Sequence, residues 1–562
     1  MGEIPKIADK KLPDGYAASA INCNLETGDL APIKGVTSIQ DLDAGAETIF
    51  RLADEWLQWN NKISVVESFV SDSGGRIVFT GDSYPKETNA ALAISSSPYP
   101  TATRRLGIPA PTAAPTVTNA GGGTGTDRDI SYCYTIIGQW SDGTVVESAP
   151  SPATDVQTIK DDDSVTINDF VDSTETGVYT THFRIYRINA TDTGAEFQFA
   201  ADLDKTTTPL EWVDNIADAD LGAALKTEGW TSPPDGLMGI LATSNGLVFG
   251  FVGNTVYVSE SFIQYAFPAA YAISVGSEIV GLGYNGAAVL ALTKTRPFAI
   301  YGDTPESLSV EQIPLDLPCK SARSIVSLPG GVIFSSTSGL QMIDSAASAT
   351  NLTIETFTRK QWEDLGPEKI FGFFYNNTYT SFWSGTKQGI EFKPGLREIR
   401  RFVLEEKVYG GQYVSTVSVN TYEVITSDSY NFLTAEGYQL VVTGATYSLT
   451  YDTLYLIQEN GSIREIAAWN SGDYLDYEYQ SREFYYPSHQ VLTAGRIVGD
   501  FSEGSVTLVL YIDGVARFTK TVSSESIFRI PPLRGNTFSV NLSGKATVES
   551  VQLGASVLEV TQ

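Results

Sequence analysis

The chain has 562 residues, which is enough for several domains that each bury a hydrophobic core. Its formal net charge of −29 argues against tight nonspecific nucleic-acid binding, because proteins that bind in this way present basic patches. With 50 Gly and 28 Tyr but only 3 Met, the composition predicts an all-β protein with many tight turns.

Cysteines and apolar segments narrow the cellular setting. Cys23, Cys133 and Cys319 are too few and too scattered for a disulfide framework or a zinc site. This usage is typical of a protein assembled in a reducing cytosol. The opening stretch MGEIPKIADKK lacks the apolar region of a secretory signal, and no run reaches the ~20 apolar residues of a membrane helix. We therefore expect a soluble protein with no membrane-spanning segment.

The first predicted element is a hairpin within residues 12–36, LPDGYAASAINCNLETGDLAPIKGV. Short apolar runs are joined here by Gly, Pro and Asp. We place the turn at Glu26–Asp29, between the strands AINCNL and LAPI. The stretch carries no catalytic chemistry.

Two segments follow with different textures. Residues 1–108 are expected to form short strands, with Trp56 and Trp59 packed between them. Residues 109–235 begin with a linker rich in Pro and Gly and continue as short strands bounded by turns, which predicts a small β-sandwich. The pieces YCYTII, ESAPSP and FRIYR loosely resemble a fibronectin type III or immunoglobulin-like module. This segment has 6 basic and 21 acidic side chains, a net charge of −15, which favours a separate domain with a solvated acidic surface.

Residues 236–480 predict the main part of a β-propeller. They contain repeated small groups of apolar strands separated by glycine turns, which is typical of propeller blades. Residues 1–108 would supply the N-terminal part, giving roughly six to eight blades in total. The hairpin of residues 12–36 could then provide the strand that closes the propeller.

Two further elements have clear local signals. One helix is expected at Thr358–Leu365, with Thr358 as its cap and Gly366–Pro367 as its end. Residues 481–562 alternate between apolar and polar positions, which predicts a C-terminal β-sandwich with a hairpin turn at Asp513–Gly514. The predicted fold is therefore all-β: a propeller interrupted by one sandwich and followed by another.

Catalytic motifs are scarce. The two histidines, His182 and His489, lie far from any nucleophile-elbow motif, so neither is expected to be catalytic. The glycine run Gly121–Gly125 lacks the lysine and the strand-to-helix setting of a phosphate-binding loop. A carboxylate pair for glycoside cleavage stays open, although no specific pair is indicated. We predict no catalytic residue, no cofactor and no metal ligand.

Clusters of charged residues leave alternatives open. Two acidic groups have oxygens that could bind Ca²⁺, although they lack the EF-hand spacing and solvated loops are preferred: Asp161–Asp163, and Asp214 with Asp218 and Asp220. The densest basic patch could contact DNA phosphate or an acidic neighbour, with a plain surface strand preferred: Arg397, Arg400 and Arg401.

The opening segment also carries a family pattern, P-x-x-Y/F-A-x-x-A-x-N-x-x-L-x-x-G-x-L-x-P. The matching residues are Pro13, Tyr16, Ala17, Ala20, Asn22, Leu25, Gly28, Leu30 and Pro32. The pattern resembles the N-terminal segment of the tail nozzle (tail tubular protein B-like) proteins of short-tailed bacteriophages. A second set fits the same family: Arg76, Thr80, Pro85, Lys86, Leu106, Gly107, Pro109 and Pro111. The resemblance covers residues 12–111 and the general texture of 237–480, and is weak elsewhere.

The resemblance implies a structural, non-enzymatic virion protein, assembled in the host cytoplasm and placed in the phage tail. Its copies would form a ring, typically a hexamer, that extends the DNA-ejection channel below the portal and adaptor. The expected partners are the adaptor protein and, as further candidates, tail fibres or a needle or plug. Genomic DNA would pass without specific binding, since an acidic wall repels it. The alternatives are a receptor- or glycan-binding tail protein and a secreted glycosidase, the latter disfavoured by the missing signal and catalytic motif.

Overall fold

The computed structural model describes residues 3–69, 75–191, 194–393, 399–422 and 445–561. Over these residues the chain forms 43 strands and two short α-helices, α1 (Ala90–Ala93) and α2 (Arg359–Asp364). The predicted all-β class is confirmed. None of the described helices combines the length and the apolar character that a membrane crossing demands. The chain divides into two compact units, a first unit of Met1–Gly45 with Leu352–Gln562 and a second unit of Ala46–Asn351.

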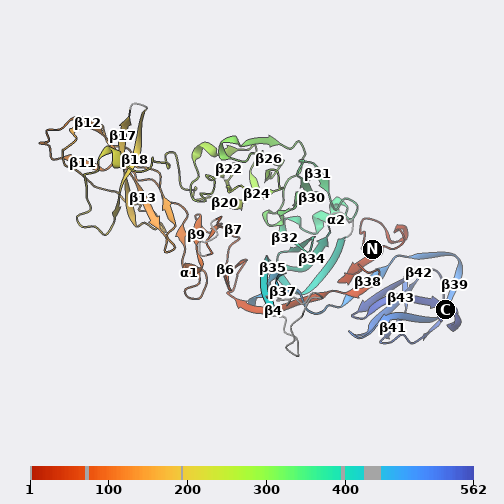
Figure 1. The fold of residues 1–562 in the computed structure, drawn as a ribbon. Helices are drawn as coiled ribbons and strands as arrows, with labels where there is room; N and C mark the ends of the chain where they lie inside the picture. Colours follow the sequence, from red (N-terminus) through yellow and green to blue (C-terminus); the bar gives the residue numbers. More distant parts are fainter. Residues whose placement is uncertain (1–2, 70–74, 192–193, 394–398, 423–444, 562) are drawn as a thin grey trace, which may run out of the picture. The chain divides into compact units, whose positions relative to one another are not determined.

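In the described part of the second unit, four of the antiparallel four-stranded sheets are each made from strands that follow one another in the chain (Figure 1). The first two sheets are β7 (Ser64–Glu67), β8 (Ile77–Thr80), β9 (Lys86–Thr88) and β10 (Arg104–Arg105), then β20 (Met238–Ala242), β21 (Val248–Val252), β22 (Thr255–Val258) and β23 (Ile273–Ser274). The other two are β24 (Ile279–Tyr284), β25 (Val289–Thr293), β26 (Phe298–Tyr301) and β27 (Ser309–Gln312), then β28 (Val326–Leu328), β29 (Gly331–Ser336), β30 (Gly339–Asp344) and β31 (Ala349–Asn351). A two-stranded sheet of β5 (Thr48–Leu52) and β6 (Glu55–Trp59) precedes them.

Strand β25 shows why some of these strands are apolar throughout. All five of its residues are buried. Val289 packs in one core cluster with Phe249 of β21, whereas Leu290 packs in another with Phe334 of β29. Because successive side chains of a strand point to opposite faces, β25 is covered on both sides. Neighbouring sheets therefore pack face to face.

Residues 109–235 pair only among themselves in the described strands. The four-stranded sheet has the order β14 (Val145–Glu147), β13 (Tyr132–Gln139), β17 (His182–Thr191) and β18 (Gly194–Asp204). A three-stranded sheet has the order β11 (Thr116–Asn119), β16 (Val165–Asn168) and β19 (Trp212–Asp214). A two-stranded sheet pairs β12 (Asp127–Ile130) with β15 (Gln157–Lys160). They enclose one core, in which Tyr134 meets Phe170 and Phe183 edge-on at 5.1 and 5.7 Å between ring centroids.

The first unit is built on a 14-stranded sheet. Its longest path runs β32 (Ile370–Tyr375), β33 (Thr378–Trp383), β34 (Thr386–Phe392), β35 (Ile399–Tyr422), β1 (Ala17–Ile21), β38 (Tyr477–Ser481), β42 (Phe528–Gly544), β39 (Phe484–Asp500) and β43 (Thr547–Gly554). The strands that branch from it are β36 (Ala445–Asn460), β37 (Ile463–Tyr474), β4 (Lys34–Leu42), β40 (Val506–Ile512) and β41 (Val515–Val522) (Figure 1). Two hydrophobic clusters form its core, one around Phe402 and Trp469 and one around Leu508 and Leu542.

The predicted local features are confirmed. Strands β2 (Cys23–Asn24) and β3 (Ala31–Pro32) form the N-terminal hairpin, and Gly28 in its turn has φ +94°, a value that favours glycine. Helix α2 is capped by Thr358, whose side chain accepts a hydrogen bond from the Gln361 N–H. Asp513 and Gly514 form the two-residue turn between β40 and β41, with φ values of 49° and 76°.

The predicted limits at residues 108 and 235 enclose described strands that pair only among themselves, whereas the predicted limit at residue 480 falls inside a sheet. Residue 480 lies inside β38, which pairs with both β1 and β42, so the sheet runs across that limit. Residues 12–36 contribute to the first unit and give no strand to the four-stranded sheets of the second unit. The segment was expected to provide the strand that closes the propeller; instead, its partners are β35, β37 and β38 of the first unit.

Candidate functional site

The family-pattern segment occupies a central position in the first unit. Strand β1 lies between β35, to which it is parallel, and β38, to which it is antiparallel. Leu30 exchanges two backbone hydrogen bonds with Val548 of β43, at 2.9 and 2.8 Å. A segment of about twenty residues thus contacts strands from three later parts of the chain.

Asn22 links two of these strands through its side chain. Its amide donates to the Val403 carbonyl at 3.2 Å and to the Asp476 carbonyl at 3.0 Å, and its oxygen accepts from the Val403 N–H at 2.8 Å. The residue has φ +58°, which asparagine tolerates better than most residues. A family-pattern position is therefore explained by backbone geometry and by hydrogen bonds that close the sheet.

The other family-pattern residues are mostly structural as well. Ala17, Ala20 and Leu30 are buried in the apolar core, and Pro32 is buried in β3. Leu25 and Tyr16 are partly buried, whereas Pro13 and Gly28 are exposed in turns. None of these nine side chains brings acid–base or nucleophilic chemistry to the segment.

The predicted basic patch is paired with carboxylates. Arg401 Nη1 lies 3.1 Å from Glu3 Oε1, and the other oxygen of Glu3 accepts from the Ala20 N–H at 2.8 Å. Burial raises the pKa of Glu3. Arg400 lies 2.7 Å from Glu26 and 3.6 Å from Glu391. The alternative of an acidic neighbour therefore describes both arginines, while Arg397 lies outside the described residues.

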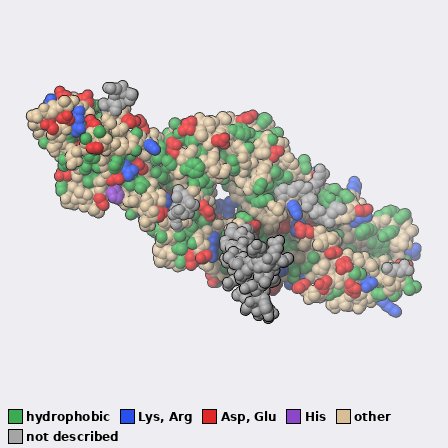
Figure 2. All heavy atoms as spheres, in the orientation of Figure 1, with side chains coloured by type: hydrophobic (Ala, Val, Ile, Leu, Met, Phe, Trp, Pro, Cys, Tyr) green, Lys and Arg blue, Asp and Glu red, His purple; other side chains and the backbone are tan. Residues whose placement is uncertain are grey.

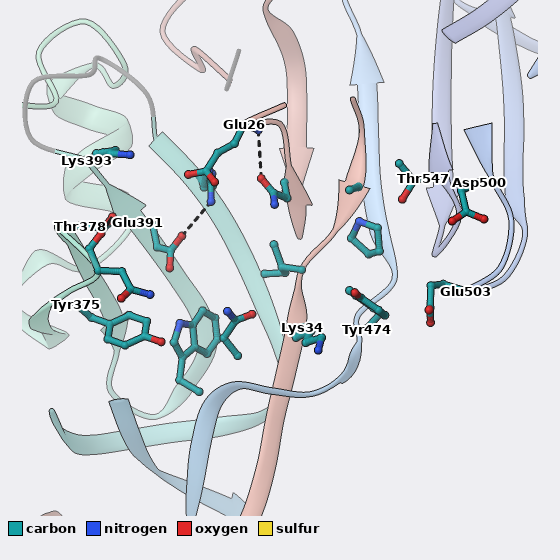
Figure 3. Close-up of a pocket in the computed structure, with 18 of the residues that line it drawn as sticks. Glu26, Lys34, Tyr375, Thr378, Glu391, Lys393, Tyr474, Asp500, Glu503 and Thr547 are labelled. Carbon is teal, nitrogen blue, oxygen red and sulfur yellow. Dashed lines mark hydrogen bonds and ion pairs between the residues drawn. The ribbon is translucent and has the colours of Figure 1, made fainter. Parts of the chain in front are cut away.

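A cavity of about 730 Å³ opens beside Arg400 (Figure 3). Tyr375, Thr378 and Glu391 lie on one side of the view, Asp500 and Glu503 on the other, and Lys34 and Tyr474 between them. The cavity is lined by Asn24, Glu26, Ala31, Pro32, Ile33, Lys34, Tyr375, Asn376, Thr378, Glu391, Lys393, Arg400, Trp469, Asn470, Tyr474, Asp500, Ser502, Glu503 and Thr547. Its volume is in the range of small-molecule binding sites.

The lining combines charge, amides and aromatic rings. Burial raises the pKa of Glu391, while Arg400 opposes that rise. Trp469 is buried against Phe402, with 4.7 Å between ring centroids, and Lys34 lies over the Tyr474 ring at 5.5 Å. The arrangement offers hydrogen-bond donors and acceptors beside aromatic surface.

Neither histidine lines this cavity. His182 Nδ1 lies 2.8 Å from Thr181 Oγ1, and its Nε2 lies 3.8 Å from Asp204. His489 is exposed on β39.

The acidic run Asp161–Asp163 accepts hydrogen bonds from the backbone of the glycine run. Backbone N–H groups of Gly123, Thr124 and Gly125 donate to Asp163 and Asp162 at 2.8–2.9 Å. Hydrogen bonds from Thr124 and Gly125 lower the pKa of Asp162, and hydrogen bonds led by Asn119 lower that of Asp163. The acidic run and the glycine run therefore form one loop-closing contact.

Of the second acidic group, Asp214 is buried in the sandwich, whereas Asp218 and Asp220 are exposed. Asp214 and Arg187 are fully buried and paired, and Arg187 also lies 2.7 Å from Asp218. The Tyr132 hydroxyl donates to Asp214, and burial raises the pKa of that tyrosine. In the part of the chain that is described, no group of three or more metal-ligating side chains has suitable geometry.

Sequence reasoning missed a buried charged cluster in the second unit. Glu87 of β9 is buried, and burial raises its pKa to about 7 despite the opposing charges of Arg76 and Arg104. Arg104 lies over the rings of Trp140 and Tyr179, at 3.9 and 3.5 Å. The available signal was Arg76, a member of the second family-pattern set.

The cavity was missed as well, because its residues come from distant parts of the sequence. Glu391, Trp469 and Tyr474 are separated from Glu26 by more than three hundred positions. No short motif marks such a set, and only the pairing of strands brings it together.

No protein-family model matches this sequence, and no curated protein sequence matches it. Among solved structures, the chain is similar to one in the complex of S. cerevisiae Dbp5 with Nup159 and Gle1, at 8% identity and a TM-score of 0.23, covering 55% of this chain and 89% of that one. It is also similar to an exo-β-1,3-galactanase from Phanerochaete chrysosporium, at 8% identity and a TM-score of 0.19, covering 93% of this chain and 99% of that one. A third similar structure is Citrobacter koseri AztD, at 11% identity and a TM-score of 0.22, covering 74% of this chain and 98% of that one. Likenesses at this level carry no argument about fold or function.

Proposed function

We propose that the chain is a tail nozzle subunit of a short-tailed bacteriophage: a non-enzymatic virion protein whose copies form a ring around the DNA-ejection channel. The observation that carries the proposal is the family pattern at residues 13–32. In the structure these residues tie together β35, β38 and β43, a structural role that suits a scaffold protein.

The arrangement of the second unit supports the fold that the family implies. Four consecutive four-stranded sheets, packed face to face, are the kind of unit from which propellers are built. We assign them as propeller blades interrupted by the sandwich of residues 109–235. The immunoglobulin or fibronectin type III character of that sandwich belongs to the same proposal.

Charge supports the passage of DNA without binding. On the face shown in Figure 2, Asp and Glu side chains are spread over several regions. In the sequence, no Lys or Arg occurs between Lys407 and Arg464, a stretch that includes most of β35 and all of β36. Lys and Arg neutralise phosphate charge, so a stretch without them adds little to DNA binding.

Electron microscopy of the purified full-length protein and of the phage particle tests the proposal. We expect rings, typically of six copies, and the same protein at the tail of the particle below the adaptor. A protein that stays monomeric at high concentration and is absent from particles would overturn the assignment.

A further inference from the structure

We infer that the cavity beside Arg400 binds a neutral saccharide unit, a binding activity that does not depend on ring formation. The cavity lies wholly within the first unit, and its lining mixes carboxylates, cations, amides and aromatic rings. This mixture is the complement of a molecule that carries many hydroxyl groups and apolar ring faces.

Arg400 and two carboxylates form the polar part of the cavity wall. Its guanidinium lies 2.7 Å from Glu26 and 3.6 Å from Glu391, which holds both carboxylates at the cavity wall. A carboxylate accepts hydrogen bonds from hydroxyl groups, and an arginine donates to them. A hydroxyl can do both, so adjacent hydroxyl groups of a sugar can bind to this set without a charge on the ligand.

The charges of the wall exclude the main competitors. An anion such as phosphate would meet three cations, but also four carboxylates: Lys34, Lys393 and Arg400 against Glu26, Glu391, Asp500 and Glu503. A metal ion would meet the same carboxylates beside a fixed guanidinium, which repels it. Because positive and negative groups are interleaved, a neutral polyol meets no net repulsion.

Tyr474 and Tyr375 form the aromatic part of the cavity wall. Both rings are only partly buried at the cavity wall, while Trp469 is buried beneath it. Aromatic rings present large apolar faces with a polar tip, so they can pack on the C–H faces of a sugar ring. Lys34 lies over the Tyr474 ring at 5.5 Å and helps to hold that ring in place.

The test uses the full-length protein and defined probes. Trisaccharides of glucose, galactose and mannose, a uronic-acid trisaccharide and inorganic phosphate are titrated separately by saturation-transfer NMR and calorimetry. We expect at least one neutral trisaccharide to bind, with a weaker response or none from the two anions. No binding of any neutral trisaccharide, or binding of the anions alone, would overturn the inference.

Variants assign the binding to the cavity. Glu26→Gln and Tyr474→Ala are each expected to weaken binding at least tenfold. Glu26 has an exposed side chain, so its replacement tests the site without removing a core residue. Matched controls are Glu311→Gln, an exposed carboxylate of the second unit, and Tyr485→Ala, an exposed ring outside the cavity; both should bind as the parent protein does.

Thermal unfolding of each variant shows that it is folded. Full affinity in a folded Glu26→Gln protein, or an equal loss in either control, would contradict the assignment. Ring formation is measured separately by electron microscopy. A protein that forms rings but binds no sugar would contradict the saccharide inference and leave the nozzle assignment intact. A protein that binds sugar but never forms rings removes only the nozzle assignment.

Discussion

Two regions of the chain each bury a glutamate near arginine, and they satisfy its oxygens to different degrees. Glu3 in the first unit accepts hydrogen bonds at both oxygens, from Arg401 and from the Ala20 N–H. Glu87 in the second unit keeps one buried oxygen without a hydrogen-bond partner in the described structure. Burial raises the pKa of both carboxyl groups, and that of Glu87 reaches about 7 despite the charges of Arg76 and Arg104.

The difference teaches what each region is built to do. The first region ties distant strands by geometry and fills its hydrogen bonds. The second holds a carboxyl whose pKa of about 7 lies near neutral pH, so its protonation changes within the physiological range. Four predictions follow from this contrast.

Deletion of residues 1–36 should have the largest effect. It removes β1 from between β35 and β38 and leaves the edges of both strands open in the sheet. We expect the first unit to misfold, measured by solubility and limited proteolysis. The internal control is the second unit, whose strands pair without residues 1–36, so a protected fragment within 46–351 should persist. Folded subunits that still form rings would count against the role given to this segment.

Glu87 should make stability depend on pH. Its folded pKa of about 7 exceeds the ordinary value of 4.5, so the folded state holds a proton that the unfolded state has lost between these values. The stabilisation is complete below pH 4.5 and is lost as pH rises through 7, by about 3 kcal/mol in total. Denaturant unfolding measures the free energy of unfolding at each pH in this window. We expect it to fall with rising pH more steeply in the parent protein than in Glu87→Gln.

Other buried carboxyl groups titrate as well, so the informative quantity is the difference between the two proteins. Glu311→Gln, at an exposed position, should leave the pH profile unchanged. A parallel pH profile for the parent and Glu87→Gln would show that Glu87 is not held protonated.

Asn22→Ala should lower the free energy of unfolding by less, about 2 kcal/mol, because three partly buried hydrogen bonds to the backbone are lost and φ +58° is disfavoured for alanine. Asn22→Gly separates the two causes, since glycine accepts this φ but makes no side-chain hydrogen bond. Denaturant unfolding gives both values. If the glycine variant is as stable as the parent, the hydrogen bonds contribute nothing.

Thr358→Ala should have the smallest effect, a loss of about 1 kcal/mol, because it removes only the cap of α2. Thr358→Ser retains the capping oxygen and serves as the control. Thermal unfolding compares the two. A loss as large as that of Asn22→Ala would show that α2 carries more of the first unit than its single turn and a half suggests.

Features set by neighbouring residues could be predicted from the sequence. The turn at Glu26–Asp29, the capped helix after Thr358 and the turn at Asp513–Gly514 depend on side chains within a few positions of one another. The all-β class follows from composition in the same local way.

Features that depend on the pairing of distant strands could not be predicted from the sequence. Nothing near Ala17 indicates that its partner is Ser481, because many apolar strands would fit the same edge. The cavity depends on these pairings, so Glu391 and Tyr474 carried no signal of their own. The acidic run Asp161–Asp163 was expected to form a solvated loop, but its partners could not be predicted, since they include backbone N–H groups that composition does not reveal.

The position of β1 has a consequence for synthesis. Ala17 leaves the ribosome early, but Ser481 follows 464 residues later, a delay of roughly 20–90 s at ordinary translation rates. During that time residues 46–351 can complete their own strand pairing, while the N-terminal segment waits without its partners. Such a strand is exposed to pairing with other nascent chains, so the yield of soluble protein should depend on how fast its message is read and on chaperones that shield the first forty-five residues.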